Sequence, residues 1–129
     1  MSLLPSFTEN DLQAYYRRVD LIRQTADQII KDFDWYGMEI KFSGKEATAY
    51  EELFNQILPH VEQLLNYNNE KLMQVLYHID VSERIVAAAV AESSEKENNN
   101  EKISESITRL IIMRELQKVV TRNYFSGRL

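Results

Sequence analysis

Apolar residues recur every three or four positions through the first part of the chain. A helix with one such apolar stripe buries it against other helices. Thr8 and Asp11 have the spacing of a capping box, although the usual second residue is Glu or Gln. We therefore predict a helix from about Thr8 to Phe33. Its stripe consists of Leu12, Tyr15, Val19, Ile22, Ala26, Ile29 and Phe33.

The helical pattern stops in the segment 34–44, which contains two glycines. Met38, Ile40 and Phe42 alternate there with polar residues, which is the period of an extended chain with one buried face. A single strand needs a second strand with which to pair. We predict an irregular, extended loop that crosses the bundle, with a strand paired to another copy of the chain as the alternative.

A second helix is predicted after this segment. Ser43 and Glu46 have the spacing of a capping box, which places the helix start near Gly44 or Lys45. Pro59 lies inside the apolar pattern, and proline removes a backbone donor and clashes with the preceding turn. Since the apolar stripe keeps its phase across Pro59, we expect a kink and not a break.

Three further helices are predicted, at about residues 70–79, 83–92 and 102–124. Ser82 is a suitable N-cap for the middle one, and the alanines of this helix make it thin, so that neighbouring helices can approach it closely. The polar stretch 93–100 has no apolar anchor, so we predict a mobile surface loop there. In the helix at 70–79 we expect burial of Leu72, Met73 and Leu76, with Tyr77 and Ile79 as further candidates.

The last predicted helix carries two apolar faces. They lie on nearly opposite sides and overlap around residues 110–113. A helix with two apolar faces contacts two surfaces. Either the second face binds another copy of the chain, or helices of the same bundle cover both faces. We favour self-association, because a domain of this size has few helices with which to cover both.

Composition narrows the class of protein. A chain of 129 residues has the size of one domain, and 3 glycines and 2 prolines are too few for a many-turned β fold. The absence of cysteine excludes disulfides, thiol nucleophiles and cysteine-rich zinc sites. The longest apolar run, residues 85–91, is too short to span a bilayer, and the N-terminus has no signal-peptide pattern. We predict one all-α domain over residues 1–129, a cytoplasmic helical bundle of about four to five helices with no membrane partner.

Charge is distributed unevenly. The first 100 residues carry 17 acidic and 9 basic side chains, whereas the remainder carries 3 acidic and 6 basic ones. Arg114, Lys118 and Arg122 recur at four-residue intervals and form a basic ridge beside Glu115. The ridge either complements the acidic remainder of the chain and the helix dipole, which we favour, or docks phosphate or an acidic partner helix. The net charge of -5 argues against general affinity for nucleic acid.

Candidate catalytic chemistry is sparse. His78 stands near Asp80 and Glu83, and a histidine with carboxylates at a helix break can bind a metal or act as a base. However, neither HExxH nor Glu-x-x-His occurs, and Ser82 lacks the glycine-rich elbow of a nucleophilic serine. We therefore predict no catalytic residue, no metal and no cofactor, and structural roles for His60 and His78.

An aromatic cluster that includes the single tryptophan lies at the end of the first predicted helix. Its members are Trp35, Tyr36, Met38 and Phe42. Such clusters form hot spots in protein interfaces, but aromatic residues beside a chain reversal more often cover the end of a core. We favour the core-covering role.

These observations favour a protein–protein interaction or regulatory module without catalytic activity, whose partners include a second copy of the chain as a homodimer. One alternative is a nucleic-acid-binding protein that uses the basic C-terminal helix. The other is a metal-dependent or histidine-based enzyme centred on His78, Asp80 and Glu83. The residues that we expect to bind a partner are Trp35, Tyr36, Met38, Phe42, Arg114, Lys118 and Arg122.

Overall fold

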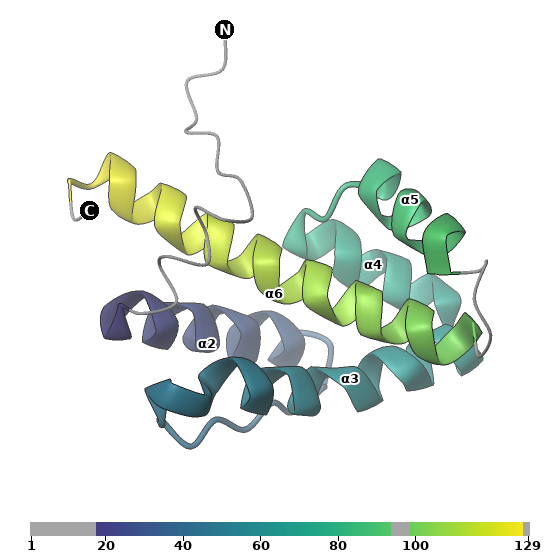
Figure 1. Ribbon diagram of the computed structural model, residues 1–129, viewed down its shortest axis with the longest axis horizontal. Coiled ribbons are helices and arrows are strands. Elements are labelled where there is room, and N and C mark those ends of the chain that lie inside the picture. The colour runs from purple at the N-terminus through teal and green to yellow at the C-terminus, as the bar shows by residue number, and fades with distance from the viewer. Residues whose placement is uncertain (1–17, 94–98, 128–129) are drawn as a thin grey trace, which may run out of the picture.

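Helices make up most of the part of the chain that the computed structural model describes, which is residues 18–93 and 99–127 (Figure 1). No strand occurs within these residues, so the predicted all-α class is confirmed. None of the described helices is long and apolar enough to cross a membrane. The elements are α2 (Val19–Asp34), the 3₁₀ turn η1 (Glu46–Thr48), α3 (Ala49–Tyr67), α4 (Asn69–Ile79), α5 (Glu83–Ser93) and α6 (Asn99–Phe125).

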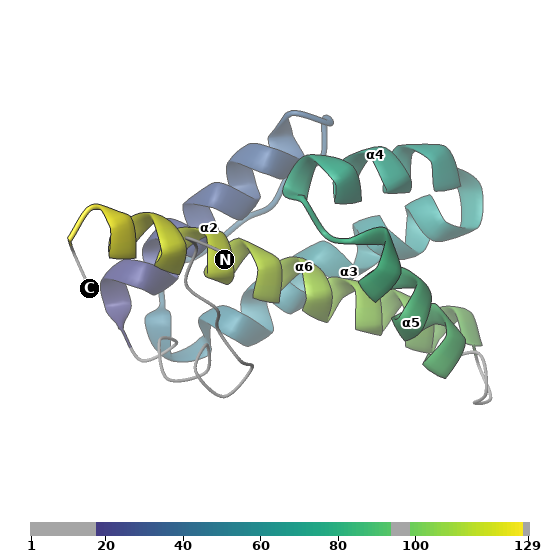
Figure 2. The ribbon, with the colours of Figure 1, turned by 90° about the horizontal axis from the view of Figure 1, so that it is seen from above.

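Helix α6 is the central element and contacts each of α2, α3, α4 and α5. In Figure 1, α2 and α3 lie along one side of α6, α5 lies along the other, and α4 lies behind, as Figure 2 shows from above. Ile111, Ile112 and Leu116 on α6 are fully buried. Helices of the same chain thus cover both apolar faces of α6, which removes the argument that the second face needs another copy. Self-association itself stays a prediction.

Helix α2 ends at Asp34, one residue after the predicted end, but it begins at Val19, because Arg18 is extended. The prediction of one unbroken helix from Thr8 is therefore wrong, although Thr8 itself lies outside the described residues.

The buried side of α2 repeats at helical spacing and includes Ile22, Ala26, Ile29 and Phe33 of the predicted stripe. The predicted burial of Val19 is wrong, because it lies at the first turn of the helix and is 48% exposed. Gly37 follows with a φ of 74°, a left-handed conformation that glycine adopts without strain, and the Met38 N–H donates to the carbonyl of Phe33. This turn ends the helix and directs the chain into the crossing segment.

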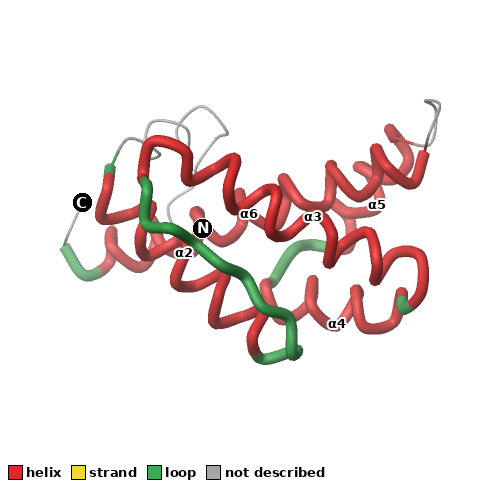
Figure 3. The backbone as a smooth tube through the Cα atoms, turned by 90° about the horizontal axis from the view of Figure 1, so that it is seen from below, coloured by secondary structure: helices red, strands yellow, loops and turns green. Residues whose placement is uncertain are grey.

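The crossing segment is a loop that runs from the end of α2 to η1 (Figure 3). Met38 and Ile40 are buried and Phe42 is half-buried against the core, whereas Glu39 and Lys41 are exposed. The predicted extended loop with one buried face is therefore confirmed.

Side chains of α3 take the place of a neighbouring strand along this loop. The Lys41 N–H donates to Gln56 Oε1 at 3.1 Å, and His60 Nε2 lies 2.9 Å from the carbonyl oxygen of Glu39. Backbone polar groups need partners when secondary structure supplies none. His60 thus has the structural role predicted for it.

The predicted capping box of Ser43 and Glu46 is wrong. The Ser43 backbone N–H and hydroxyl both donate to the Glu52 carboxylate, the latter at 2.7 Å. Glu46 instead pairs with Arg23 of α2 at 2.8 Å. Helix α3 therefore begins at Ala49, after η1, and then continues through Pro59 without a break.

The boundaries of α4 and α5 agree with the predicted ones to within one residue, and α6 begins three residues earlier than predicted. The predicted loop at 93–100 is wrong at both of its ends, because Ser93 ends α5 and Asn99 and Asn100 begin α6. Residues 94–98 lie outside the described residues. The predicted burial of Met73 and Tyr77 is wrong, because α4 turns only a narrow side to the core. That buried side consists of Leu72, Val75, Leu76 and Ile79.

Truncation of a buried side chain of α6 should lower the free energy of unfolding. Val120 is fully buried on α6, whereas Val19 at the start of α2 is 48% exposed. We expect V120A to lower the free energy of unfolding by about 2 kcal/mol, because it removes buried methyl groups and leaves a cavity. The matched variant V19A should cost less than about 0.7 kcal/mol. Urea denaturation measures both, and equal losses would contradict the central position of α6.

Candidate functional site

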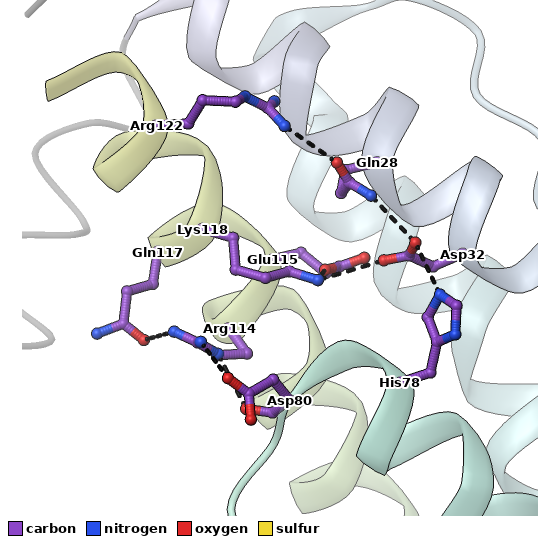
Figure 4. Close-up of polar contacts among 9 residues, drawn as sticks. All are labelled: Gln28, Asp32, His78, Asp80, Arg114, Glu115, Gln117, Lys118 and Arg122. Carbon is purple, nitrogen blue, oxygen red and sulfur yellow. Dashed lines mark hydrogen bonds and ion pairs between the residues drawn. The ribbon is translucent and has the colours of Figure 1, made fainter. Parts of the chain in front are cut away.

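The basic ridge of α6 faces the α4–α5 turn and α2 (Figure 4). Arg114 donates from Nε to the carbonyl oxygen of Asp80 at 2.9 Å and from Nη2 to its Oδ2 at 2.8 Å. Asp80 is the C-cap of α4, with a left-handed φ of 69°. Arg114 therefore holds the turn between α4 and α5, with Gln117 accepting a further hydrogen bond from Nη1.

The other two ridge residues also bind within the chain. Lys118 Nζ lies 3.3 Å from Asp32 Oδ2 on α2 and 2.5 Å from Glu115 Oε1 on α6. Arg122 donates to Gln28 Oε1 on α2 at 3.2 Å. These contacts agree with the interpretation that the basic helix complements the rest of the chain.

Asp32 and Glu115 form a buried carboxyl pair. The side chain of Asp32 is 6% exposed and that of Glu115 is fully buried. Burial raises the pKa of Glu115 to about 8, and the neighbouring Asp32 carboxylate adds to this effect while Lys118 opposes it. At neutral pH the buried pair therefore holds a protonated Glu115 beside an ionised Asp32.

The same contacts have the opposite effect on the pKa of Asp32, which they lower. Burial alone would raise the pKa of Asp32, but the neighbouring Glu115, the charge of Lys118 and the amide of Gln28 outweigh burial and lower it. Gln28 Nε2 donates to Asp32 Oδ1 at 3.0 Å. The carboxylate of Asp32 thus accepts hydrogen bonds from both Gln28 and Lys118.

His78 connects this cluster to the surface. Its Nε2 lies 3.4 Å from Asp32 Oδ1, and one third of its side chain is exposed. The ring of Tyr36 meets the His78 ring edge-on at 5.4 Å between centroids, and the Trp35 ring lies 6.1 Å away. The Tyr36 hydroxyl donates to the carbonyl of Gln74 on α4 at 3.2 Å. The aromatic residues at the end of α2 therefore contact α4 directly.

A shallow groove of about 450 Å³ lies beside these rings. Trp35 and Tyr77 at this surface are 76% and 84% exposed, and Met73 is 42% exposed. We call Trp35, Tyr36, Met73 and Tyr77 the α2–α4 aromatic surface. The residues that line the groove are Tyr36, Glu70, Met73, Gln74 and Tyr77.

The predicted aromatic cluster is divided between core and surface. Met38 and Phe42 pack into or against the core, which is the core-covering role favoured for the cluster. Trp35 points to solvent, and Tyr36 lies between the two environments. Sequence reasoning missed Met73 and Tyr77 as surface residues. Their four-residue spacing places them on one helix face but gives no signal of exposure, because the buried Leu72 and Leu76 have the same spacing.

The structure does not bring His78, Asp80 and Glu83 together as one ligand set. His78 pairs with Asp32, and Asp80 pairs with Arg114. Within the described parts of the chain, no group of three His, Cys, Asp or Glu side chains is placed to hold a metal ion.

Asp32 and Glu115 were not singled out from the sequence as members of a buried cluster. Glu115 has Ile111 four residues before it and Val119 four residues after it, both fully buried. A carboxylate within such an apolar stripe signals a buried charge. Asp32 gave a weaker signal, because its partner Lys118 is 86 residues away along the chain.

Comparison with protein-family models, with curated proteins and with solved structures found no match for the chain. The function is therefore argued from the geometry of the described residues.

The buried carboxyl pair predicts how stability depends on pH. Between the ordinary pKa of 4.5 and about 8, the native state keeps a proton on Glu115 that the unfolded chain releases. The free energy of unfolding should therefore fall as pH rises through this window, by up to about 1.4 kcal/mol per pH unit. E115Q should flatten this fall in urea denaturation from pH 5 to 8. The exposed Glu101 provides the control E101Q, and an equal slope in all three proteins would refute the assignment.

Replacement of Lys118 should lower the free energy of unfolding more than replacement of Arg122. K118M leaves the pair of buried carboxyl groups without its neutralising charge, so we expect a loss of about 2–4 kcal/mol of unfolding free energy at pH 7. Arg122 bonds only to the amide of Gln28 among the contacts described, so R122M should cost less than about 1 kcal/mol. Denaturation at equal pH and salt compares the two, and a near-neutral K118M would contradict a structural role for the ridge.

Proposed function

We propose that the chain is a protein–protein interaction or regulatory module without catalytic activity, and that it binds a protein partner through the α2–α4 aromatic surface. The observation that carries this proposal is the exposure of Trp35 and Tyr77, at 76% and 84%. Large aromatic side chains are enriched at the energetic centres of interfaces, where they are buried on binding. The groove beside Tyr36, Met73 and Tyr77 gives a partner side chain a place to enter.

The surroundings of this surface support a pre-organised interface. The ring of His78 lies against the rings of Trp35 and Tyr36, and its Nε2 pairs with the buried Asp32. The Tyr36 hydroxyl is held by α4. Binding by side chains that are already ordered costs less conformational entropy than binding by mobile ones.

The contacts of the basic ridge favour this proposal over nucleic-acid binding. The side chains of Arg114 and Lys118 are 28% and 26% exposed, and both are paired with carboxylates of the same chain. A phosphate would have to displace these carboxylates before it could bind. The separate pairing of His78 and Asp80 likewise favours a module without catalytic activity. We retain the homodimer and the cytoplasmic location as parts of the proposal.

Substitution of the exposed aromatic residues should abolish partner capture without unfolding the protein. W35A and Y77A should each retain less than about one tenth of the captured partner, because each removes a hot-spot side chain. Tyr124 is 54% exposed at the far end of α6, so Y124A is the matched control and should bind as the wild type does.

The measurement is affinity capture from lysate of the native host, with nuclease treatment, alongside thermal denaturation of each variant. A protein partner that survives nuclease and is lost only with W35A and Y77A supports the proposal. Capture that disappears with nuclease would favour nucleic-acid binding. Equal capture by all variants would show that the partner binds elsewhere.

A further inference from the structure

His78 connects the buried carboxyl pair to the α2–α4 aromatic surface. Its Nε2 lies 3.4 Å from Asp32 Oδ1, on the carboxylate that also contacts Lys118 (Figure 4). The same imidazole ring lies 5.4 Å from the ring of Tyr36 and 6.1 Å from that of Trp35, measured between centroids. One titratable side chain therefore contacts both a buried carboxylate and the aromatic rings of the proposed binding surface.

Exposure to solvent increases along this series of contacts. Glu115 is fully buried, Asp32 is 6% exposed and one third of the His78 side chain is exposed. Trp35, at the outer end of the series, is 76% exposed. His78 can therefore exchange a proton with solvent, while its charge acts on a carboxylate that water screens poorly.

The charged groups around His78 come from each helix that packs here. They are Asp32 of α2, Glu115 and Lys118 of α6, and the pair of Asp80 and Arg114 at the turn after α4. Histidine is the side-chain type that ordinarily changes charge between about pH 5 and about 8. Asp32 stays ionised throughout this range, because its pKa lies below the ordinary value of a carboxyl group. A proton gained by His78 thus meets a carboxylate that is already charged.

We propose that a proton on His78 regulates the α2–α4 aromatic surface. A charged His78 donates a charge-assisted hydrogen bond to Asp32, and the imidazolium attracts the electron-rich rings of Tyr36 and Trp35. Both effects hold the end of α2 against α4, so the two aromatic rings are more ordered when His78 is charged. Because Asp32 balances the charge, burial of the charged ring by a partner costs less than burial of an isolated cation.

The consequence for binding rests on the proposed function of this surface. An ordered surface loses less conformational entropy on binding than a mobile one. Partner binding should therefore strengthen as pH falls and His78 gains its proton.

The composition of the chain makes the inference measurable on the free protein, because the chain contains one tryptophan and two histidines. Time-resolved fluorescence anisotropy reports the local motion of Trp35, and NMR signals of the two imidazole rings report their protonation. Between about pH 8 and about pH 5, the motion of Trp35 should become more restricted as His78 gains its proton. The two titrations should share one midpoint.

Three variants assign the transition to His78. H78Q keeps a polar side chain beside Asp32 but carries no charge, so the motion of Trp35 should not change with pH. H60Q is the matched control, because it removes the other histidine, which contacts the carbonyl oxygen of Glu39, and it should keep the transition. E115Q keeps position 115 uncharged and should also keep the transition, which separates His78 from the titration of Glu115. Circular dichroism at each pH confirms that the variants are folded.

A transition that follows the protonation of His78 and disappears only in H78Q supports the inference. Motion of Trp35 that does not depend on pH overturns it. A transition that H78Q retains, or that H60Q or E115Q loses, also overturns it.

Affinity capture from nuclease-treated host lysate tests the effect on binding. Capture through Trp35 and Tyr77 should be at least about fivefold greater at about pH 6 than at about pH 8 for the wild type and H60Q, and equal at the two pH values for H78Q. Capture that does not vary with pH would overturn the proposed regulation and leave the proposed function intact. If no partner is captured through these residues, the proposed function fails, and the motion of Trp35 in the free protein still decides whether His78 controls this surface.

Discussion

The buried contact of Asp32 and Glu115 with Lys118 is the constraint on which the arrangement of α2, α4 and α6 depends. Two carboxyl groups lie in the interior, and the partly exposed Lys118 reaches both of them from α6. A displacement of α2 along α6 would leave a charge without its partner in a medium that solvates it poorly. Apolar packing along α6 could accept several registers of similar energy, but this polar contact accepts one. The cluster thus sets where α2 ends relative to α4.

The position of that end determines the surface that we assign to binding. His78 reaches from α4 to Asp32 and lies against the rings of Trp35 and Tyr36. Those two residues follow the last turn of α2, so their contacts with α4 depend on the buried cluster beneath them. Arg114, Lys118 and Arg122 bond within the chain, whereas Trp35 and Tyr77 of the α2–α4 aromatic surface are exposed. Under the proposed function, a partner is recognised by apolar burial, whereas the charges of Arg114 and Lys118 hold helices of the chain together.

The sequence predicts the positions of the helices far better than it predicts which side chains contact one another. The boundaries of α4 and α5 follow from local periodicity and turn residues, and agree with the structure to within one residue. The crossing segment was predictable for the same reason, since Met38 and Ile40 alternate with polar neighbours. The contacts of Glu46 with Arg23 and of Asp32 with Lys118 were not predictable. The two residues of each pair are far apart along the chain, and no periodic pattern links them. The exposure of Trp35 escaped prediction for a related reason, since it depends on the turn at Gly37 and on where α4 packs.

The most direct measurement is site-specific photo-cross-linking of the folded protein in host lysate after nuclease treatment. A photoreactive phenylalanine analogue replaces Tyr77 in one preparation and Tyr124, which is also exposed, in another. Binding through the α2–α4 aromatic surface predicts a discrete protein adduct from position 77 that is absent from position 124. No protein adduct at position 77, or the same adducts from both positions, would contradict it.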